Sequence, residues 1–309
     1  MDTEERNKSV WNEPFFMFRK VNKCYSNAIS FFTDRFWKII KLALPILFLG
    51  AFGITVILYV LCDATLQISF ASSLFFCFFA IIVILFTLSI VISFLYRCID
   101  VNIESINLYS VGYKYIYNKI FFNRLLKAFI VVLVAFIIIA LIGLGIYYIN
   151  KVTTEDILTY EHVLVKTWIL GISGSVLLMV VLLPLFMSLN TVMYNKKHIW
   201  FNLWNGYKLG WKKWGRVFAL DFLITITISV LFLFVMAPAY VISLMQHSAT
   251  LSRMQGDVVD IPFYFPWITA LILFMSSMFL IILILMKFMP QAYLYASFVS
   301  EEKDEINNK

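Results

Sequence analysis

Six long apolar runs divide this chain, and nearly all of its lysines and arginines lie in every second segment between them. Each run is close to or above about 20 apolar residues, the length that crosses the hydrocarbon core of a bilayer as a helix. The runs lie at about 42–62, 70–96, 128–149, 167–194, 217–245 and 266–286. We therefore expect six transmembrane helices.

The basic residues are divided very unequally between the two sides of the membrane that these spans define. One side holds 22 of the 25 lysines and arginines, in segments 1–41, 97–127, 195–216 and 287–309. The other side holds three, in segments 63–69, 150–166 and 246–265. An excess of Lys and Arg in short loops is typical of the cytoplasmic side. The pattern predicts a multi-pass protein of the bacterial cytoplasmic (inner) membrane with both termini in the cytoplasm.

The composition excludes a single soluble core, because 62% of the residues are hydrophobic and only 14% are charged. The net charge of +7 does not indicate nucleic-acid binding, since the excess lies beside the predicted spans. Cations in such positions meet anionic lipid head groups, an attraction of about 1 kcal/mol each. We expect membrane lipids as partners at the cytoplasmic face, with a membrane-protein partner or a homo-oligomer as a further possibility, and no nucleic acid.

The runs group into three hairpins, each preceded by a cytoplasmic amphipathic stretch. The pattern G-Y-K-x-x-aromatic-x-K begins at Gly112 and again at Gly206, which indicates an approximate repeat of these units. We predict an all-α helix bundle with six transmembrane helices and three interfacial helices. The expected parts are a cytoplasmic N-terminal segment with an amphipathic helix (1–41), the transmembrane domain (42–299) and a disordered cytoplasmic tail (300–309).

The stretch 200–216 carries aromatic residues at alternating spacings of four and three, which places them on one face of a helix. Rings flanked by cations suit the head-group layer, so we predict a helix in the cytoplasmic interface. Its role is to fix the depth of the spans or, alternatively, to recognise lipids or a partner. The predicted interface residues are Trp200, Trp204, Tyr207, Lys208, Trp211, Lys212, Lys213 and Trp214, and before the third span Tyr113, Lys114 and Tyr117.

Two prolines, Pro184 and Pro290, lie in the cytoplasmic halves of the fourth and sixth spans. A proline inside a span frees a backbone carbonyl group and bends the helix, and nearby polar side chains can satisfy the freed group. Each proline is followed by such residues: Ser188, Asn190, Thr191 and Tyr194 in the fourth span, and Gln291, Tyr293, Tyr295 and Ser297 in the sixth. We predict helix kinks here, explained by bundle packing or by a lined cavity.

Asp221 and Lys287 are ionisable residues at similar depth near the inner ends of the fifth and sixth spans. Charged groups inside a membrane are costly and tend to pair or to serve a function. A pair between these two helices is physically reasonable. A structural bridge or snorkelling to the interface explains it as well as an ion pathway does, and the outer halves of the spans are nearly pure Leu, Ile, Val and Phe.

Motifs of known enzyme chemistry are missing from the sequence. There are three histidines, no HExxH zinc motif, no phosphate-binding Gly-rich loop and no G-x-S-x-G elbow. The four cysteines show no CxxC spacing. We expect no catalytic, cofactor or metal site, and therefore no enzyme activity.

The segment 184–218 carries the strongest family resemblance, reading PLFMSLNTVMYNKK and then FNLWNGYKLGWKKWGRVF. It resembles the six-helix membrane domain of membrane-anchored glycerophosphodiester phosphodiesterases and related uncharacterised bacterial membrane families. The resemblance implies an all-α inner-membrane protein. Asn195, Lys196 and Lys197 stand where that family usually has an acidic turn, and we expect no phosphodiesterase domain, so no catalytic residues are implied.

These observations favour an integral inner-membrane protein that acts as a non-enzymatic scaffold or accessory protein and engages lipids or a partner at the cytoplasmic face. The alternative is a small-solute or lipid transporter. Its cavity would lie near the inner ends of the fourth, fifth and sixth helices, around Pro184, Pro290, Asp221 and Lys287.

Overall fold

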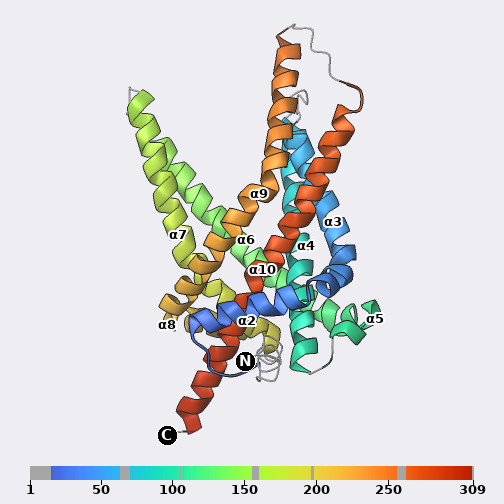
Figure 1. Ribbon diagram of the computed structural model, residues 1–309. Coiled ribbons are helices and arrows are strands. Elements are labelled where there is room, and N and C mark those ends of the chain that lie inside the picture. Colours follow the sequence, from blue (N-terminus) through green and yellow to red (C-terminus); the bar gives the residue numbers. More distant parts are fainter. Residues whose placement is uncertain are drawn as a thin grey trace.

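The computed structural model describes residues 15–62, 70–104, 106, 108–154, 160–195, 198–255 and 262–307. Its described part is helical and holds no β-strand (Figure 1). The helices are α2 (Val21–Asp34), α3 (Phe36–Cys62), α4 (Phe70–Ile103), η1 (Leu108–Ser110), α5 (Tyr113–Ile116), α6 (Lys119–Thr154), α7 (Tyr160–Tyr194), α8 (Ile199–Lys212), α9 (Trp214–Met254) and α10 (Phe265–Asn307).

Six of these helices are long and apolar enough to cross a membrane, and they confirm the predicted all-α bundle. They are α3, α4, α6, α7, α9 and α10, and each contains one of the six apolar runs. The helices are longer than the runs; α6, for example, begins at Lys119, well before its apolar run at 128. A helix continues past the hydrocarbon boundary when its polar end is stabilised by neighbours or by water.

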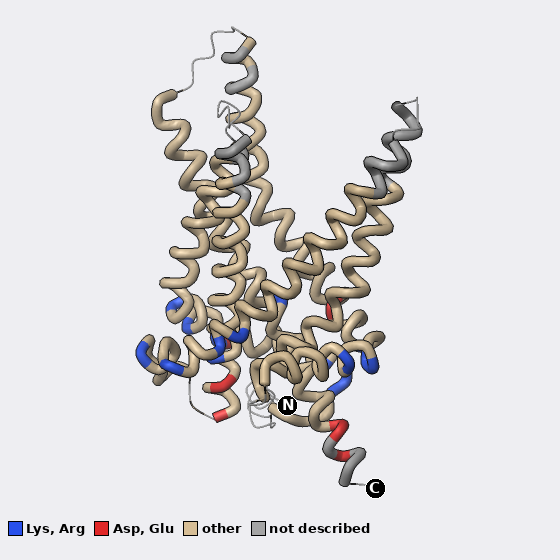
Figure 2. Tube along the Cα trace, turned by 180° about the vertical axis from the view of Figure 1, so that it is seen from behind, with Lys and Arg blue, Asp and Glu red and all other residues tan. Residues whose placement is uncertain are grey.

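The described lysines and arginines gather at one end of the bundle, which we call the basic end (Figure 2). The helices α2, α5 and α8 lie there, across the ends of the long helices (Figure 1). The first and the last described residues lie at the same end. Toward the opposite end, the α6–α7 hairpin diverges from α3, α4, α9 and α10.

The two groups of helices also differ in burial. In the most apolar 18-residue stretch of α4, 50% of the residues are buried, whereas in that of α6 only 6% are buried. Lipid chains solvate apolar side chains as well as a protein interior does, so a membrane helix can leave such a surface uncovered. The core is therefore concentrated where the helices also make polar contacts.

Charged side chains connect neighbouring helices at the basic end. Lys127 of α6 donates hydrogen bonds to the carbonyl oxygens of Val192 (3.1 Å) and Asn195 (3.3 Å), where α7 ends. A lysine in this position satisfies carbonyl groups that lack a partner in the helix and complements the helix dipole. The Arg124 guanidinium pairs with the Asp100 carboxylate of α4 at 2.9 Å. Thus α6 is attached to both of its neighbours.

An aromatic cluster fills the centre of the basic end. Tyr194 stacks on Tyr295 with ring centroids 5.7 Å apart, and it meets the edge of Tyr96 at 5.6 Å. The Tyr96 hydroxyl, fully buried, donates to Asn190 Oδ1 at 2.6 Å. Phe15 packs on Tyr293 from the segment before α2. The cluster joins α4, α7, α10 and the N-terminal segment in one packed unit.

The segment before α2 is fixed to α10 by two reciprocal hydrogen bonds. The Arg19 amide donates to Ser297 Oγ at 2.8 Å, and Ser297 Oγ donates to the Arg19 carbonyl oxygen at 3.0 Å. On α2, the Tyr25 hydroxyl shares a 2.9 Å hydrogen bond with Thr227 of α9.

Burial raises the pKa of Cys24 to about 11, so this thiol stays protonated and unreactive at neutral pH.

The prediction of a continuous amphipathic helix before the third span is wrong. The residues before α6 form the turn η1 and the single-turn helix α5 instead. The backbone leaves helical geometry at Gly112 (ψ 173°) and at Tyr117 (ψ 56°). Asn118 then starts α6, because its Oδ1 accepts hydrogen bonds from the amides of Ile120 and Phe121. An asparagine at this position is a strong helix N-cap and ends the preceding turn.

The predicted disordered tail is also wrong, since α10 continues through Asn307. Glu301 explains the extension. Its carboxylate accepts two hydrogen bonds from the Arg216 guanidinium, both of 2.9 Å, and lies 3.1 Å from Lys213 Nζ. Because both partners lie where α8 meets α9, the acidic end of α10 is held against that corner as a helix.

Candidate functional site

The helix α8 lies on α7 through a face of small residues. Asn202, Gly206 and Gly210, spaced four apart, are its buried residues. A Cβ atom at Gly206 would lie 2.5 Å from Ser188 Cα, and one at Gly210 would lie 2.7 Å from Pro184 Cα. Only glycine permits this approach of two backbones, the arrangement that small residues spaced four apart provide in membrane proteins.

The opposite face of α8 carries the predicted aromatic stripe and is exposed. The side chains of Trp200, Trp204 and Trp211 are 66%, 56% and 46% exposed. Tyr207 stacks on Trp204 with ring centroids 6.2 Å apart, and Lys208 Nζ lies 5.3 Å from the centre of the Trp204 ring. We call the exposed residues Trp200, Trp204, Lys208 and Trp211, together with the partly buried Tyr207, the α8 surface.

Two residues predicted for this stripe lie elsewhere. The helix ends before Lys213, whose backbone is non-helical, and Lys213 points to Glu301 instead. Trp214 begins α9 and stacks on Phe218 at 5.1 Å. The prediction of one continuous helix over 200–216 is therefore wrong, because Arg216 and Lys213 turn the chain toward Glu301 at this point.

Tyr113, Lys114 and Tyr117 do not join the α8 surface; α5 and α8 lie on opposite sides of the basic end (Figure 1). The Tyr113 hydroxyl donates to the Lys41 carbonyl oxygen at 2.6 Å, and the Tyr117 hydroxyl donates to that of Leu42 at 2.8 Å. Both tyrosines therefore attach α5 to α3, while Lys114 is exposed.

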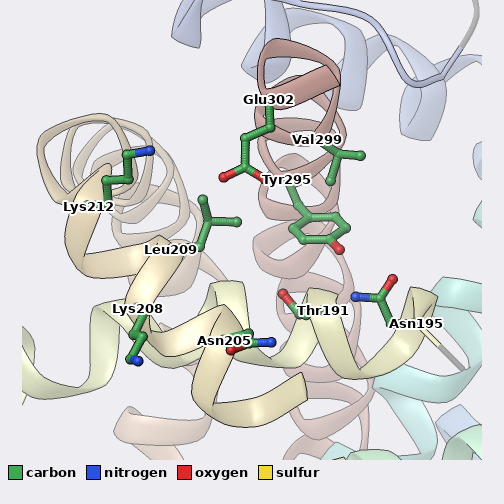
Figure 3. Close-up of a pocket in the computed structure, with 9 residues that line it drawn as sticks. All are labelled: Thr191, Asn195, Asn205, Lys208, Leu209, Lys212, Tyr295, Val299 and Glu302. Carbon is green, nitrogen blue, oxygen red and sulfur yellow. The ribbon is translucent and has the colours of Figure 1, made fainter. Parts of the chain in front are cut away.

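A pocket of about 490 Å³ opens at the basic end between α7, α8 and α10 (Figure 3). Two of its lining residues, Lys208 and Lys212, were predicted from the sequence as interface residues. The other lining residues are Thr191, Asn195, Asn205, Leu209, Tyr295, Val299 and Glu302. The polar residues after Pro184 and Pro290 were the signal for part of this lining, whereas Glu302 was missed because the tail was expected to be disordered. We call this cavity the α7–α8–α10 pocket.

Asp221 and Lys287 do come together, as the sequence suggested, but they line neither this pocket nor the apolar one described below. The distance between Lys287 Nζ and Asp221 Oδ1 is 3.9 Å. Gln291 Nε2 lies 3.4 Å from the same oxygen, and the Thr225 hydroxyl lies 3.5 Å from the other carboxylate oxygen. The buried carboxylate is thus surrounded by one cation and two polar groups, an arrangement that links α9 to α10.

Pro184 lies inside α7 and Pro290 lies inside α10. Two further prolines lie inside other helices, Pro45 in α3 and Pro238 in α9. Pro184 has a clear packing role, since it receives Gly210 of α8. A second cavity, of about 390 Å³, lies beside Pro238 between α9 and α10 and is apolar apart from Ser276. The kinks predicted at Pro184 and Pro290 stay a prediction.

Groups of three or more His, Cys, Asp or Glu residues that could hold a metal ion do not occur in the part of the chain that the structure describes. No protein-family model, curated protein or solved structure matches the chain. The resemblance of segment 184–218 to the phosphodiesterase membrane domain therefore stays a prediction.

The contact of α8 with α7 predicts a sharp difference among three neighbouring glycines. We expect Gly206→Ala and Gly210→Ala each to lower stability by about 1–3 kcal/mol, because the new methyl group meets backbone atoms. Gly215→Ala is the matched control, since a Cβ atom there meets open space. The measurement is thermal unfolding of the protein in detergent. Equal unfolding midpoints for the three variants would contradict the packing.

The ion pair between α9 and α10 predicts coupled effects. Asp221→Asn and Lys287→Met should each destabilise the detergent-extracted protein, and the double variant should partly recover. We expect a coupling of about 0.5–1 kcal/mol, small because the Lys287 side chain is 35% exposed. Losses that simply add in the double variant would show that the two groups do not interact.

Proposed function

We propose that this chain is a multi-pass protein of a bacterial cytoplasmic membrane that acts as a non-enzymatic scaffold or accessory protein, binding anionic lipid head groups through the α8 surface. The observation that carries the proposal is the orientation of α8. Its glycine face is occupied by α7, and three tryptophans with a lysine face away from the bundle.

The chemistry of this surface supports lipid binding at the level of the head groups. Indole rings are enriched at that depth because one part of the ring is apolar and the N–H group is polar. Lys208 and its neighbours add attraction for anionic lipids of about 1 kcal/mol per cation. The surface combines both contributions on one rigid helix.

The orientation in the membrane is part of the proposal. Lysines and arginines of the described residues gather at the end where α2, α5 and α8 lie (Figure 2). An excess of basic residues on the cytoplasmic side is the general rule for helical membrane proteins. We infer that the basic end, with both ends of the chain, faces the cytoplasm.

Transport of a small solute or lipid is the second candidate, supported by the buried Asp221 carboxylate and by cavities at two depths between the helices. The aromatic cluster opposes it. Tyr96, Tyr194, Tyr293 and Tyr295 pack at the inner ends of α4, α7 and α10, where a transport path would have to pass. Transport would require this cluster to separate in each cycle, so we favour the lipid-binding role.

The proposed orientation predicts where single cysteines react. In a variant with the four native cysteines replaced, Lys23→Cys on α2 and Asp304→Cys on α10 should be labelled by a membrane-impermeant maleimide only after the cells are opened. Both positions are exposed at the basic end. Labelling of either cysteine in intact spheroplasts would place the basic end outside the cell and exclude the proposal.

The α8 surface predicts selective retention of anionic lipid. After extraction from membranes that contain phosphatidylglycerol and phosphatidylethanolamine, native mass spectrometry should detect bound phosphatidylglycerol on the wild type. The variant Trp204→Ala/Lys208→Met/Trp211→Ala should retain severalfold less. Trp37→Ala is the control, since Trp37 is 80% exposed but belongs to α3. Unchanged retention in the triple variant would leave α8 as a simple depth anchor.

A further inference from the structure

The α7–α8–α10 pocket brings opposite charges together from parts of the chain that are distant in sequence. Lys212 of α8 supplies an ammonium group to one wall, and Lys208, one helical turn earlier, also lines the pocket while its Nζ lies 5.3 Å from the centre of the Trp204 ring. Glu302 of α10 supplies a carboxylate to the opposite wall, facing Lys212 across the opening (Figure 3). The pocket thus has a cationic side and an anionic side.

The floor and sides of the pocket are polar as well. Thr191 and Tyr295 are buried at 5% and 4% exposure, so their positions are fixed by the bundle. Asn205 of α8 and Asn195, which directly follows α7, add two side-chain amides to the lining (Figure 3). Amides and hydroxyls both donate and accept hydrogen bonds, and they can orient either part of a ligand that carries two charges.

The charges exclude the simplest ligands. A purely anionic ligand would meet the Glu302 carboxylate, and a purely cationic ligand would meet the Lys212 ammonium group. Like charges at close range repel, while a ligand with both signs, placed in the matching order, is attracted at both ends. The pocket is therefore complementary to a short zwitterion.

We infer that the α7–α8–α10 pocket binds a small molecule in which a phosphate group is joined by a short chain to a primary ammonium group, phosphoethanolamine being the simplest. Two lysines and one glutamate give the walls a net charge of +1. A phosphate monoester carries about −1.5 to −2 at neutral pH, so with its ammonium group the ligand carries close to −1. An amino acid, whose charges sum to zero, would leave this net charge of +1 unbalanced.

The dimensions agree with this ligand class. A volume of about 490 Å³ lies within the range of small-molecule pockets, and the opening leaves room for a substituent on the phosphate. Soluble phosphoethanolamine and the head group of phosphatidylethanolamine share the phosphate and the ammonium group at the same spacing, although the phosphodiester of the lipid carries a single negative charge. The inference rests on the proposed function only for the side of the membrane that the pocket faces; in detergent both ends of the bundle are accessible.

The test is calorimetric titration of the detergent-solubilised full chain with O-phosphoethanolamine, glycerol 3-phosphate, phosphocholine and glycine. We expect phosphoethanolamine to bind at least tenfold more tightly than the other three. Glycerol 3-phosphate lacks the ammonium group, phosphocholine cannot donate a hydrogen bond to Glu302, and glycine lacks the phosphate. Absence of phosphoethanolamine binding at millimolar concentration, or equal binding of all four compounds, would overturn the inference.

Variants assign the two ends of the ligand. Lys212→Met should weaken phosphoethanolamine binding tenfold or more, whereas Glu302→Gln should remove the preference over glycerol 3-phosphate. Lys23→Met and Asp304→Asn, which change exposed charges outside the pocket, should keep the wild-type affinity. An equal loss in these control variants would reduce the effect to net charge and overturn the assignment.

The source of the ligand is decided by repeating the titration in nanodiscs. If the head group of a lipid occupies the pocket, phosphatidylethanolamine discs should weaken the apparent affinity for soluble phosphoethanolamine relative to phosphatidylcholine discs. Equal affinities in the two kinds of disc assign the pocket to a soluble compound. Retention of phosphatidylglycerol by the α8 surface is measured separately, so either proposal can fail while the other stands.

Discussion

The cost of placing a charged side chain in hydrocarbon determines most of this structure. The described lysines and arginines gather at one end of the bundle, and the polar partners of several of them lie at the same end. There Lys127 caps α7, Arg124 pairs with Asp100, and Arg216 pairs with Glu301. In the other half the contacts between helices are mostly apolar, with few polar ones such as the 3.4 Å hydrogen bond between Thr55 and Ser277, and the α6–α7 hairpin diverges from the rest.

The spans were predictable because the length of an apolar run and the thickness of a bilayer are related by simple geometry. Every run lies within one helix. The failures lie outside the hydrocarbon, where local periodicity competes with specific contacts. Asn118 ends the expected helix before α6, and Glu301 orders a tail that its acidic composition assigned to solvent. In both cases a few hydrogen bonds outweigh the local pattern, and such bonds are not visible in hydrophobic periodicity.

The candidate site was predictable in part for the same reason. The tryptophan spacing in segment 200–216 correctly placed three aromatic side chains on the exposed face of α8. The buried face, with Gly206 and Gly210, follows the equally regular spacing of small residues, a signal that the aromatic pattern obscured. The pocket was predictable only in part: the polar residues after Pro184 and Pro290 indicated a lined cavity, but Lys212 and Glu302 are brought to it by tertiary packing and share no sequence motif.

The contact of Gly210 with Pro184 has a mechanical consequence. Where two backbones are in direct contact, no flexible side chains lie between them that could absorb a movement. The helices α7 and α8 therefore move together as one rigid unit. A thinner or thicker bilayer changes the tilt of a spanning helix. Because Lys213 and Arg216 bind Glu301, such a tilt of α7 would be passed through α8 to the end of α10 that carries Glu302. The thickness of the surrounding membrane would thereby act on both walls of the pocket.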